Sequence, residues 1–153
     1  MNKITPFLWF DNQAEEAMNF YMSVFKNSKV HSVIPGPNGI AQSVTFELEG
    51  QQFIALNAGP QFKFNEAISF FVDCKTQEEV DELWAKLTAD GGEESMCGWL
   101  KDKYGLSWQI IPSALGGMIS DPDPAKSQRA VQAMLQMRKI DIEGIRKAYN
   151  GEA

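Results

Sequence analysis

The sequence predicts an α+β fold built from two βαβββ units and a C-terminal helical tail. Three observations lead to this prediction. Segments typical of strands and helices follow in the same order in residues 1–60 and in residues 61–115. The helix segments of these two modules match residue by residue. A further segment with a helical pattern follows at 122–150. We therefore treat the 153 residues as a single domain composed of these three parts.

The first module begins with residues 4–10, which are apolar and aromatic and predict a strand in which Pro6 would suit an edge position. The helix after it is predicted from one apolar stripe at three- and four-residue spacing. The stripe consists of Ala14, Ala17, Met18, Tyr21, Val24 and Phe25. Three strands are then expected, the last two joined in a hairpin at Gly50, and they cover residues 29–34, 40–49 and 51–58.

The second module repeats this order. Residues 67–73 predict a strand, and Thr76 with Glu79 forms a capping-box pair at the start of a helix. The apolar stripe of that helix is Val80, Leu83, Trp84 and Leu87. Residues 94–100 and 106–111 predict strands joined by a turn at 101–105.

The two helices support an internal duplication. At one constant offset Phe20 matches Leu83, Tyr21 matches Trp84 and Val24 matches Leu87. A sheet with one helix against it still has a second face to bury. We therefore expect the two modules to pair around one shared concave surface.

The tail has its own helix signals. Asp123 can cap a helix whose first residue is Pro124. One face of this helix is expected to carry Val131, Met134, Leu135 and Arg138, and a second short helix at 141–149 carries Ile142, Ile145 and Tyr149. This tail either packs on the domain or on a second subunit, or it forms a lid over a ligand.

Composition excludes several classes of function. Acids outnumber bases 20 to 14 and give a net charge of -6, which repels nucleic-acid backbones. No apolar run reaches the roughly 20 residues of a membrane helix, and the basic start of a signal peptide is missing. The two cysteines have no CxxC spacing, and His31 is the only histidine. We expect a cytoplasmic protein without a multi-histidine metal site, bound neither to nucleic acid nor to a membrane.

Several segments resemble the PhnB-like group of the vicinal oxygen chelate superfamily, to which glyoxalase, extradiol dioxygenases and bleomycin-resistance proteins belong. They are residues 97–112 (CGWLKDKYGLSWQIIP), 68–72 (ISFFV), 56–60 (LNAGP) and the tail at 134–149. The resemblance implies the glyoxalase-like fold for the two modules. Members of the group are often called 3-demethylubiquinone-9 3-methyltransferase-like. We expect no methyltransferase activity, because Gly91-Gly92 and Gly116-Gly117 belong to no glycine-rich nucleoside-binding motif.

The resemblance also implies where a metal would bind. Enzymes of the superfamily hold one divalent cation with four side chains from the first and last strands of each module. Here Gln109 follows Gly105 at about the distance of the family glutamates, and Asn57 is the nearest polar residue in the matching strand of the first module. Neutral amides lack the charge that offsets dehydration of the cation. We expect no metal and no other cofactor.

Strand alternation selects the residues of a cleft. Ser107, Gln109 and Ile111 share one face of their strand, which leaves Trp108 for the core. If Gln109 faces the cleft, the candidate ligand-binding residues are Thr5, Phe7, Trp9, Asn57, Ser69, Phe71, Trp99 and Gln109. An aromatic cleft with a few amide and hydroxyl groups suits a small, flat or apolar ligand. The alternative is that these aromatic side chains merely fill the cleft.

Other reactive side chains have structural interpretations. We expect His31 to be a surface residue and Cys74 and Cys97 to be buried structural cysteines. The pair Glu78-Glu79 is expected in a first helical turn, and Glu93-Glu94 in a solvated loop.

Two hypotheses follow, and whether the protein is an enzyme stays open. The first is metal-free binding of a small apolar or aromatic molecule. The second is a metal-dependent lyase, isomerase or dioxygenase with an Asn/Gln metal shell. A purely structural or interaction module is a third, weaker hypothesis. We expect a homodimer in every case, because apolar surface of the tail needs to be covered.

Overall fold

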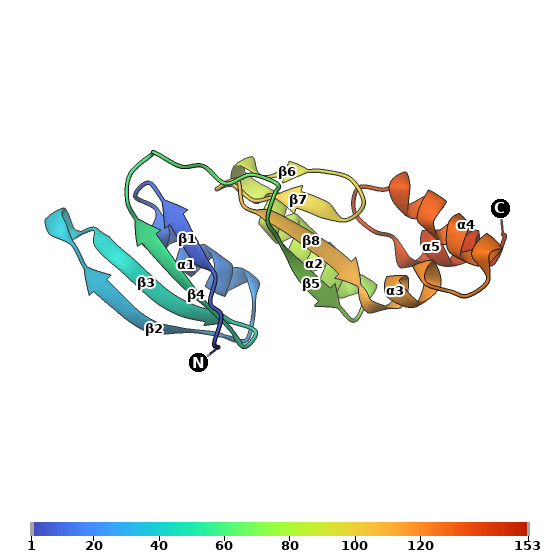
Figure 1. The fold of residues 1–153 in the computed structure, drawn as a ribbon, viewed down its shortest axis with the longest axis horizontal. Coiled ribbons are helices and arrows are strands. Elements are labelled where there is room, and N and C mark those ends of the chain that lie inside the picture. The colour runs from blue at the N-terminus through green and yellow to red at the C-terminus, as the bar shows by residue number, and fades with distance from the viewer. Residues whose placement is uncertain (1, 153) are drawn as a thin grey trace. The chain divides into compact units, whose positions relative to one another are not determined.

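The computed structural model describes residues 2–152 and contains two four-stranded sheets, each with a long helix packed against it (Figure 1). The chain divides into two compact units, Met1–Lys63 and Phe64–Ala153, which we call the first and the second unit. Three further helices follow the last strand. The predicted α+β fold with a duplicated βαβββ pattern and a helical tail is confirmed.

The sheet of the first unit has the strand order β1-β4-β3-β2. Its strands are β1 (Phe7–Phe10), β2 (Ser28–Pro35), β3 (Ala41–Leu48) and β4 (Gln51–Asn57), and a short 3-10 helix, η1 (Pro37–Gly39), precedes β3. Strand β1 runs parallel to β4, and the other pairs are antiparallel. Helix α1 (Ala14–Val24) packs on β3 and β4, and all six residues of the predicted stripe are buried.

Two local features shape this sheet. Strand β1 begins at Phe7 instead of residue 4, because Pro6 has no N–H to donate. The Pro6 carbonyl still accepts a hydrogen bond of 3.0 Å from the Ile54 N–H. The hairpin between β3 and β4 turns at Glu49 and Gly50, whose φ angles are 49° and 86°. Two successive positive φ angles match the right-handed twist of the flanking strands.

The second unit repeats the arrangement with the order β5-β8-β7-β6. Its strands are β5 (Ser69–Cys74), β6 (Glu93–Glu94), β7 (Trp99–Lys101) and β8 (Ser107–Pro112), and β5 is parallel to β8. Helix α2 (Gln77–Thr88) packs on β5, β7 and β8 and ends in the 3-10 helix η2 (Ala89–Gly91). The predicted cap is present, since the Thr76 hydroxyl accepts a bond of 3.1 Å from the Glu79 N–H. All four residues of its stripe are buried.

The sequence predicted one strand at residues 94–100, but these residues do not form a single strand. Cys97 and Gly98 have φ angles of 60° and 85°, so the chain reverses between β6 and β7. Glu93 then pairs with Lys101 in an antiparallel register. The strand prediction failed because a positive φ at a cysteine leaves no trace in an apolar pattern.

The tail forms helices α3 (Ser113–Ile119), α4 (Pro124–Leu135) and α5 (Ile142–Tyr149). Helix α4 begins as predicted, with the Asp123 carboxylate accepting a bond of 3.0 Å from the Ala125 N–H. Helix α3 was not predicted, because Gly116 and Gly117 are poor helix formers. Leu115 compensates by packing into a core shared by all three helices.

The predicted face of α4 is partly wrong. Leu135 is 46% exposed, and Arg138 lies beyond the end of the helix. Ala130 is buried instead, and Ala133, Met134 and Met137 pack against the tail core. Alanine allows close approach of neighbouring helices, so the small residues of α4 turn inward and Leu135 turns outward.

The tail packs on its own unit, in agreement with one of the expected alternatives. The N–H groups of Cys97 and Gly98 donate to the carbonyls of Met137 and Arg138, both at 2.8 Å. The Gln77 side chain donates to the Ile140 carbonyl and accepts from the Ile142 N–H. The tail is therefore fixed to the turn before β7 and to the start of α2.

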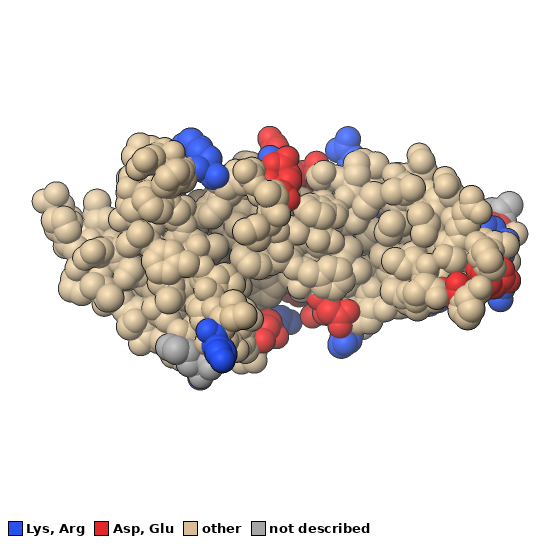
Figure 2. All heavy atoms as spheres, in the orientation of Figure 1, with Lys and Arg blue, Asp and Glu red and all other residues tan. Residues whose placement is uncertain are grey.

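Residues 2–152 contain no helix that is both long and apolar enough to cross a membrane. On the face drawn in Figure 2, Lys and Arg side chains are scattered, and Asp and Glu side chains lie among them.

Candidate functional site

The two faces of the second sheet have different surroundings. Leu100, Trp108 and Ile110 share the face that α2 covers, and each is at most 3% exposed. The opposite face, which we call the open face, carries Ser69, Phe71, Trp99, Lys101, Ser107 and Gln109. This division follows the alternation of side chains along each strand.

Strand order arranges the open face in two rows. Trp99 and Phe71 lie on either side of Gln109, because β7 and β5 are the two neighbours of β8. Lys101 and Ser69 flank Ser107 in the same way. The first row is an amide between two aromatic rings, and the second consists of hydroxyl groups beside an ammonium group.

A hydrogen bond joins the two rows. The Gln109 side-chain amide donates to the Ser69 hydroxyl at 2.9 Å. Both residues are partly buried, so this bond fixes the orientation of the amide next to the aromatic rings. Phe71 is 61% exposed, so a ligand can reach the open face beside this ring.

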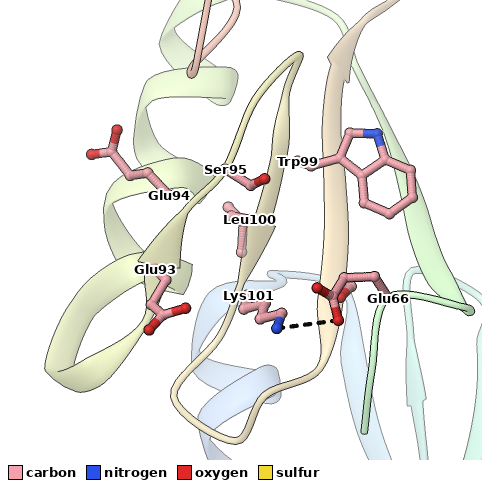
Figure 3. Close-up of a pocket in the computed structure, with 8 residues that line it drawn as sticks. Glu66, Glu93, Glu94, Ser95, Trp99, Leu100 and Lys101 are labelled. Carbon is pink, nitrogen blue, oxygen red and sulfur yellow. Dashed lines mark ion pairs between the residues drawn. The ribbon is translucent and has the colours of Figure 1, made fainter.

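Ser107 is one of the residues that line a pocket beside this face, and Figure 3 shows seven of the others. The pocket has a volume of about 160 Å³ and is lined by Glu66, Glu93, Glu94, Ser95, Trp99, Leu100, Lys101 and Ser107. Ser107 is 1% exposed, and its hydroxyl is the one buried side-chain polar atom of residues 2–152 without a hydrogen-bond partner. Such a group is costly to bury and is free to bond a ligand.

Two of the lining residues of this pocket form an ion pair. The Lys101 ammonium group is 3.2 Å from the Glu66 carboxylate, as the dashed line in Figure 3 marks. The hydrogen bond and the charge of Lys101 lower the pKa of Glu66 below its ordinary value. Glu93 pairs with Lys101 through the backbone, whereas the Glu94 carboxylate points away from Lys101 and Glu66.

The position of Trp99 depends on the turn before it. Gly98 has a φ of 85°, and a Cβ at this position would lie 2.7 Å from Ile111 Cδ1 and 3.1 Å from the Ile110 carbonyl oxygen. Only glycine fits there without displacing the neighbouring chain. The two backbone bonds from Cys97 and Gly98 to the tail hold the turn, so Trp99 enters β7 beside Gln109.

In the first unit, Phe7 and Trp9 lie on the sheet face that α1 does not cover. Their alternate neighbours Leu8 and Phe10 are buried against the helix. The Trp9 indole donates to the Gly59 carbonyl at 2.9 Å and contacts the Phe62 ring edge-on, with ring centres 4.8 Å apart. Phe7 is 58% exposed.

Thr5 and Asn57 are placed differently. Thr5 precedes β1, and its hydroxyl donates to the Asn2 carbonyl at 3.4 Å. The Asn57 side chain accepts from the Ala14 N–H at 2.9 Å and donates to the Ala41 carbonyl at 2.8 Å. Asn57 therefore anchors the start of α1 on the side of the sheet that the helix covers, and we omit it from the site proposed below.

The comparisons with known proteins identify the family. The family model described as 3-demethylubiquinone-9 3-methyltransferase matches residues 2–111. The chain belongs to this family, the PhnB-like group of the vicinal oxygen chelate superfamily. A PhnB protein from Bacillus cereus is 38% identical, with a TM-score of 0.68, over 72% of this chain and 99% of that one.

More distant structures share the fold of this PhnB-like protein. Protein PA1353 from Pseudomonas aeruginosa is 16% identical with a TM-score of 0.62, over 73% of this chain and 98% of its own. The fosfomycin resistance protein FosX from Listeria monocytogenes is 13% identical with a TM-score of 0.54, over 73% of this chain and 93% of its own. The comparison with curated proteins gives no match. Helices α3 to α5 follow residue 111 and lie outside the family match.

The side chains at the implied metal position of this PhnB-like protein are neutral donors. Within residues 2–152, no group of three or more His, Cys, Asp or Glu side chains is placed to hold an ion. Gln109 lies at the position that the resemblance implies for a ligand, and its amide nitrogen donates to the Ser69 hydroxyl. A neutral amide and a hydroxyl do not supply the charge that binding of Mg²⁺ or Ca²⁺ requires.

The remaining reactive side chains are not among the residues of the open face. His31 is exposed, as expected, and is 3.1 Å from the Glu47 carboxylate. Cys74 is fully buried, and burial, with the charges of Glu79 and Asp73, raises the pKa of its thiol to about 12. Cys97 is half-buried, in contrast to the expectation, because its positive φ turns it out of the sheet.

Of the residues that line the pocket, Trp99 alone was a predicted site residue. Glu93 was expected in a solvated loop, but it lies in β6 opposite Lys101. Lys101 is two residues after Trp99, so strand alternation could have placed both on one face. Glu66 comes from the segment before β5, and nothing in the sequence pattern relates it to Lys101.

Proposed function

We propose that this PhnB-like protein binds a small apolar or aromatic molecule on the open face, without a metal. The observation that carries the proposal is the row in which the Gln109 amide lies between Trp99 and Phe71. Aromatic surface supplies affinity for a flat ligand, and a fixed amide orients it. The bond from Gln109 to Ser69 keeps the amide in place before the ligand arrives.

The sheet topology supports binding over methyl transfer from a nucleoside cofactor. Such cofactors usually bind at a glycine-rich turn after a strand of a parallel sheet. Each sheet here contains one parallel pair only. Gly91-Gly92 ends the segment after α2, and Gly116-Gly117 lies inside α3. The metal-dependent alternative is not supported either, because the donors around Gln109 are neutral.

Ligand screening with matched variants tests this proposal. A panel of small aromatic compounds is screened by thermal shift, and hits are titrated against Trp99→Ala and Gln109→Ala. Both variants should bind at least about tenfold more weakly, which corresponds to loss of one good contact. Gln132→Ala, at an exposed position of α4, serves as the control and should bind normally.

Two results would overturn the proposal. The first is the absence of any binding at millimolar concentrations across the panel. The second is one equivalent of divalent metal per chain in protein purified without chelators, because a bound ion would show that the neutral donors do form a metal site.

A further inference from the structure

We infer that the pocket at Ser107 binds a positively charged amino group of the ligand. This inference rests on the proposed function, since it assigns a second chemical feature to the molecule held on the open face. It is carried by the buried Ser107 hydroxyl and by the charges around it. The aromatic part of the ligand would lie on the neighbouring row, between Trp99 and Phe71.

The Ser107 hydroxyl is the feature that indicates a ligand. It lines the pocket and is shielded from solvent, and no protein group bonds it. A buried hydroxyl loses its bonds to water and gains none in return, which is unfavourable in a folded chain. A ligand N–H group that donates to this oxygen would remove the penalty.

The charges around the pocket select the sign of the ligand. Lys101 forms its ion pair with Glu66, and the opposite charges of that pair balance each other. Glu93 lies beside this pair on the same face of the hairpin and adds a negative charge (Figure 3). An ammonium group is therefore attracted to the pocket, whereas a carboxylate or phosphate would be repelled.

The geometry of the sheet limits the length of the ligand. The two rows are two residues apart along β8, which corresponds to roughly 7 Å. An amine joined to an aromatic ring through one or two carbon atoms spans this distance. Trp99 lines both the pocket and the aromatic row, and its ring face adds a favourable interaction with a cation.

Phenethylamine and phenethyl alcohol form a suitable pair of probes, because they have nearly the same size and shape and differ in charge. Both are titrated by calorimetry at neutral pH. The amine should bind at least about tenfold more tightly, as expected for a charge-assisted hydrogen bond. Added salt should reduce this preference, because it screens the charge of Glu93.

Three variants test which residues cause the preference for the amine over the alcohol. Glu93→Gln should reduce the ratio of amine to alcohol affinity several-fold and leave binding of the alcohol unchanged. Ser107→Ala should weaken binding of the amine more than binding of the alcohol, because the bond from a charged donor is the stronger one. Glu78→Gln is the control, since it removes the same charge at an exposed position of α2, the helix that packs on the opposite face of the sheet. It should keep most of the preference. Circular dichroism and thermal unfolding verify that each variant is folded.

The outcomes separate the inference from the proposed function. If both probes bind with equal affinity, the amino-group site is overturned and binding on the open face stands. A preference for the amine that survives both Ser107→Ala and Glu93→Gln also overturns it. If neither probe binds, and no aromatic compound of the wider panel binds, the proposed function itself is overturned.

Discussion

The indole nitrogen of Trp108 donates a hydrogen bond of 2.9 Å to the Asp102 carboxylate in the interior of the second unit. Asp102 is 2% exposed, and its other oxygen accepts from the N–H groups of Tyr104 and Leu106, at 2.9 and 3.1 Å. One carboxylate thus closes the turn between β7 and β8 and ties it to the core. Lys101 and Ser107 flank this turn, so the pocket depends on it.

Asp102→Ala should lower the free energy of unfolding by about 3 kcal/mol, because three donors lose a buried charged acceptor. Asp102→Asn should have a smaller effect, since its carbonyl oxygen keeps the two backbone bonds. Urea unfolding followed by circular dichroism measures both. Asp11→Ala, at an exposed position, is the control and should change stability by less than about 0.5 kcal/mol. Equal stability of Asp102→Ala and the unmodified chain would contradict this account.

Gly98→Ala should destabilise the protein by about 2–4 kcal/mol. The new methyl group would meet Ile111 and Ile140 at 2.7 and 3.1 Å, and the φ of 85° is strained for alanine. Gly117→Ala provides the contrast, because a Cβ there meets no atom within 4 Å and α3 gains a better helix former. It should leave stability unchanged or raise it slightly. Thermal unfolding distinguishes the two, and similar effects would refute the steric argument.

Ser107→Ala should not weaken the free protein. The substitution removes a buried hydroxyl that has no partner, so the free energy of unfolding should stay the same or rise by up to about 1 kcal/mol. Loss of amine binding together with undiminished stability would mark Ser107 as a binding residue. A clear loss of stability would show that the hydroxyl has a structural partner in solution.

The two cysteines should differ in reactivity. Cys97 is half-buried and should be alkylated in the native protein at pH 8, whereas Cys74 should react only after unfolding. Because folding raises the pKa of Cys74 to about 12, the native state favours its protonated thiol. This contribution to stability is present below the unfolded pKa near 9 and is lost as the pH rises toward 12. Mass spectrometry after alkylation counts the labelled sites, and equal labelling rates would contradict the prediction.

The chain should form a dimer in solution. Edge strand β2 exposes Val33 and Ile34 by 42% and 52%, and an apolar strand at a sheet edge favours association. Light scattering should therefore give about twice the chain mass of 17.1 kDa. A mass near that of one chain would refute the dimer.

Much of the fold could be predicted because its signals are local. The stripes of α1 and α2 and the cap at Thr76 depend on spacings of three or four residues, and the cap at Asp123 depends on a spacing of one or two. The break at Cys97 and the helix at Gly116-Gly117 depend on tertiary contacts instead. The tail core holds α3 together despite its glycines, and the bonds from the tail hold Cys97 at positive φ.

The same distinction applies to the site. Alternation along β8 separates Ser107 and Gln109 from Trp108, so these positions could be assigned to faces from sequence alone. The orientation of the Asn57 side chain could not be predicted from sequence, because a strand end has polar neighbours on both sides. Glu66 reaches Lys101 across a distance in the chain that no short pattern spans.

The junction between the tail and the turn at Cys97 and Gly98 has an evolutionary consequence. Both hydrogen bonds across it join backbone groups, so they do not depend on which side chains occupy positions 137 and 138. Point mutations at the exposed Arg138 should accumulate with little harm, whereas Met137 also packs against the tail core. A single inserted or deleted residue between α4 and α5 would shift both carbonyls at once. Related proteins that carry this tail should therefore vary at position 138 and keep the length of that loop constant.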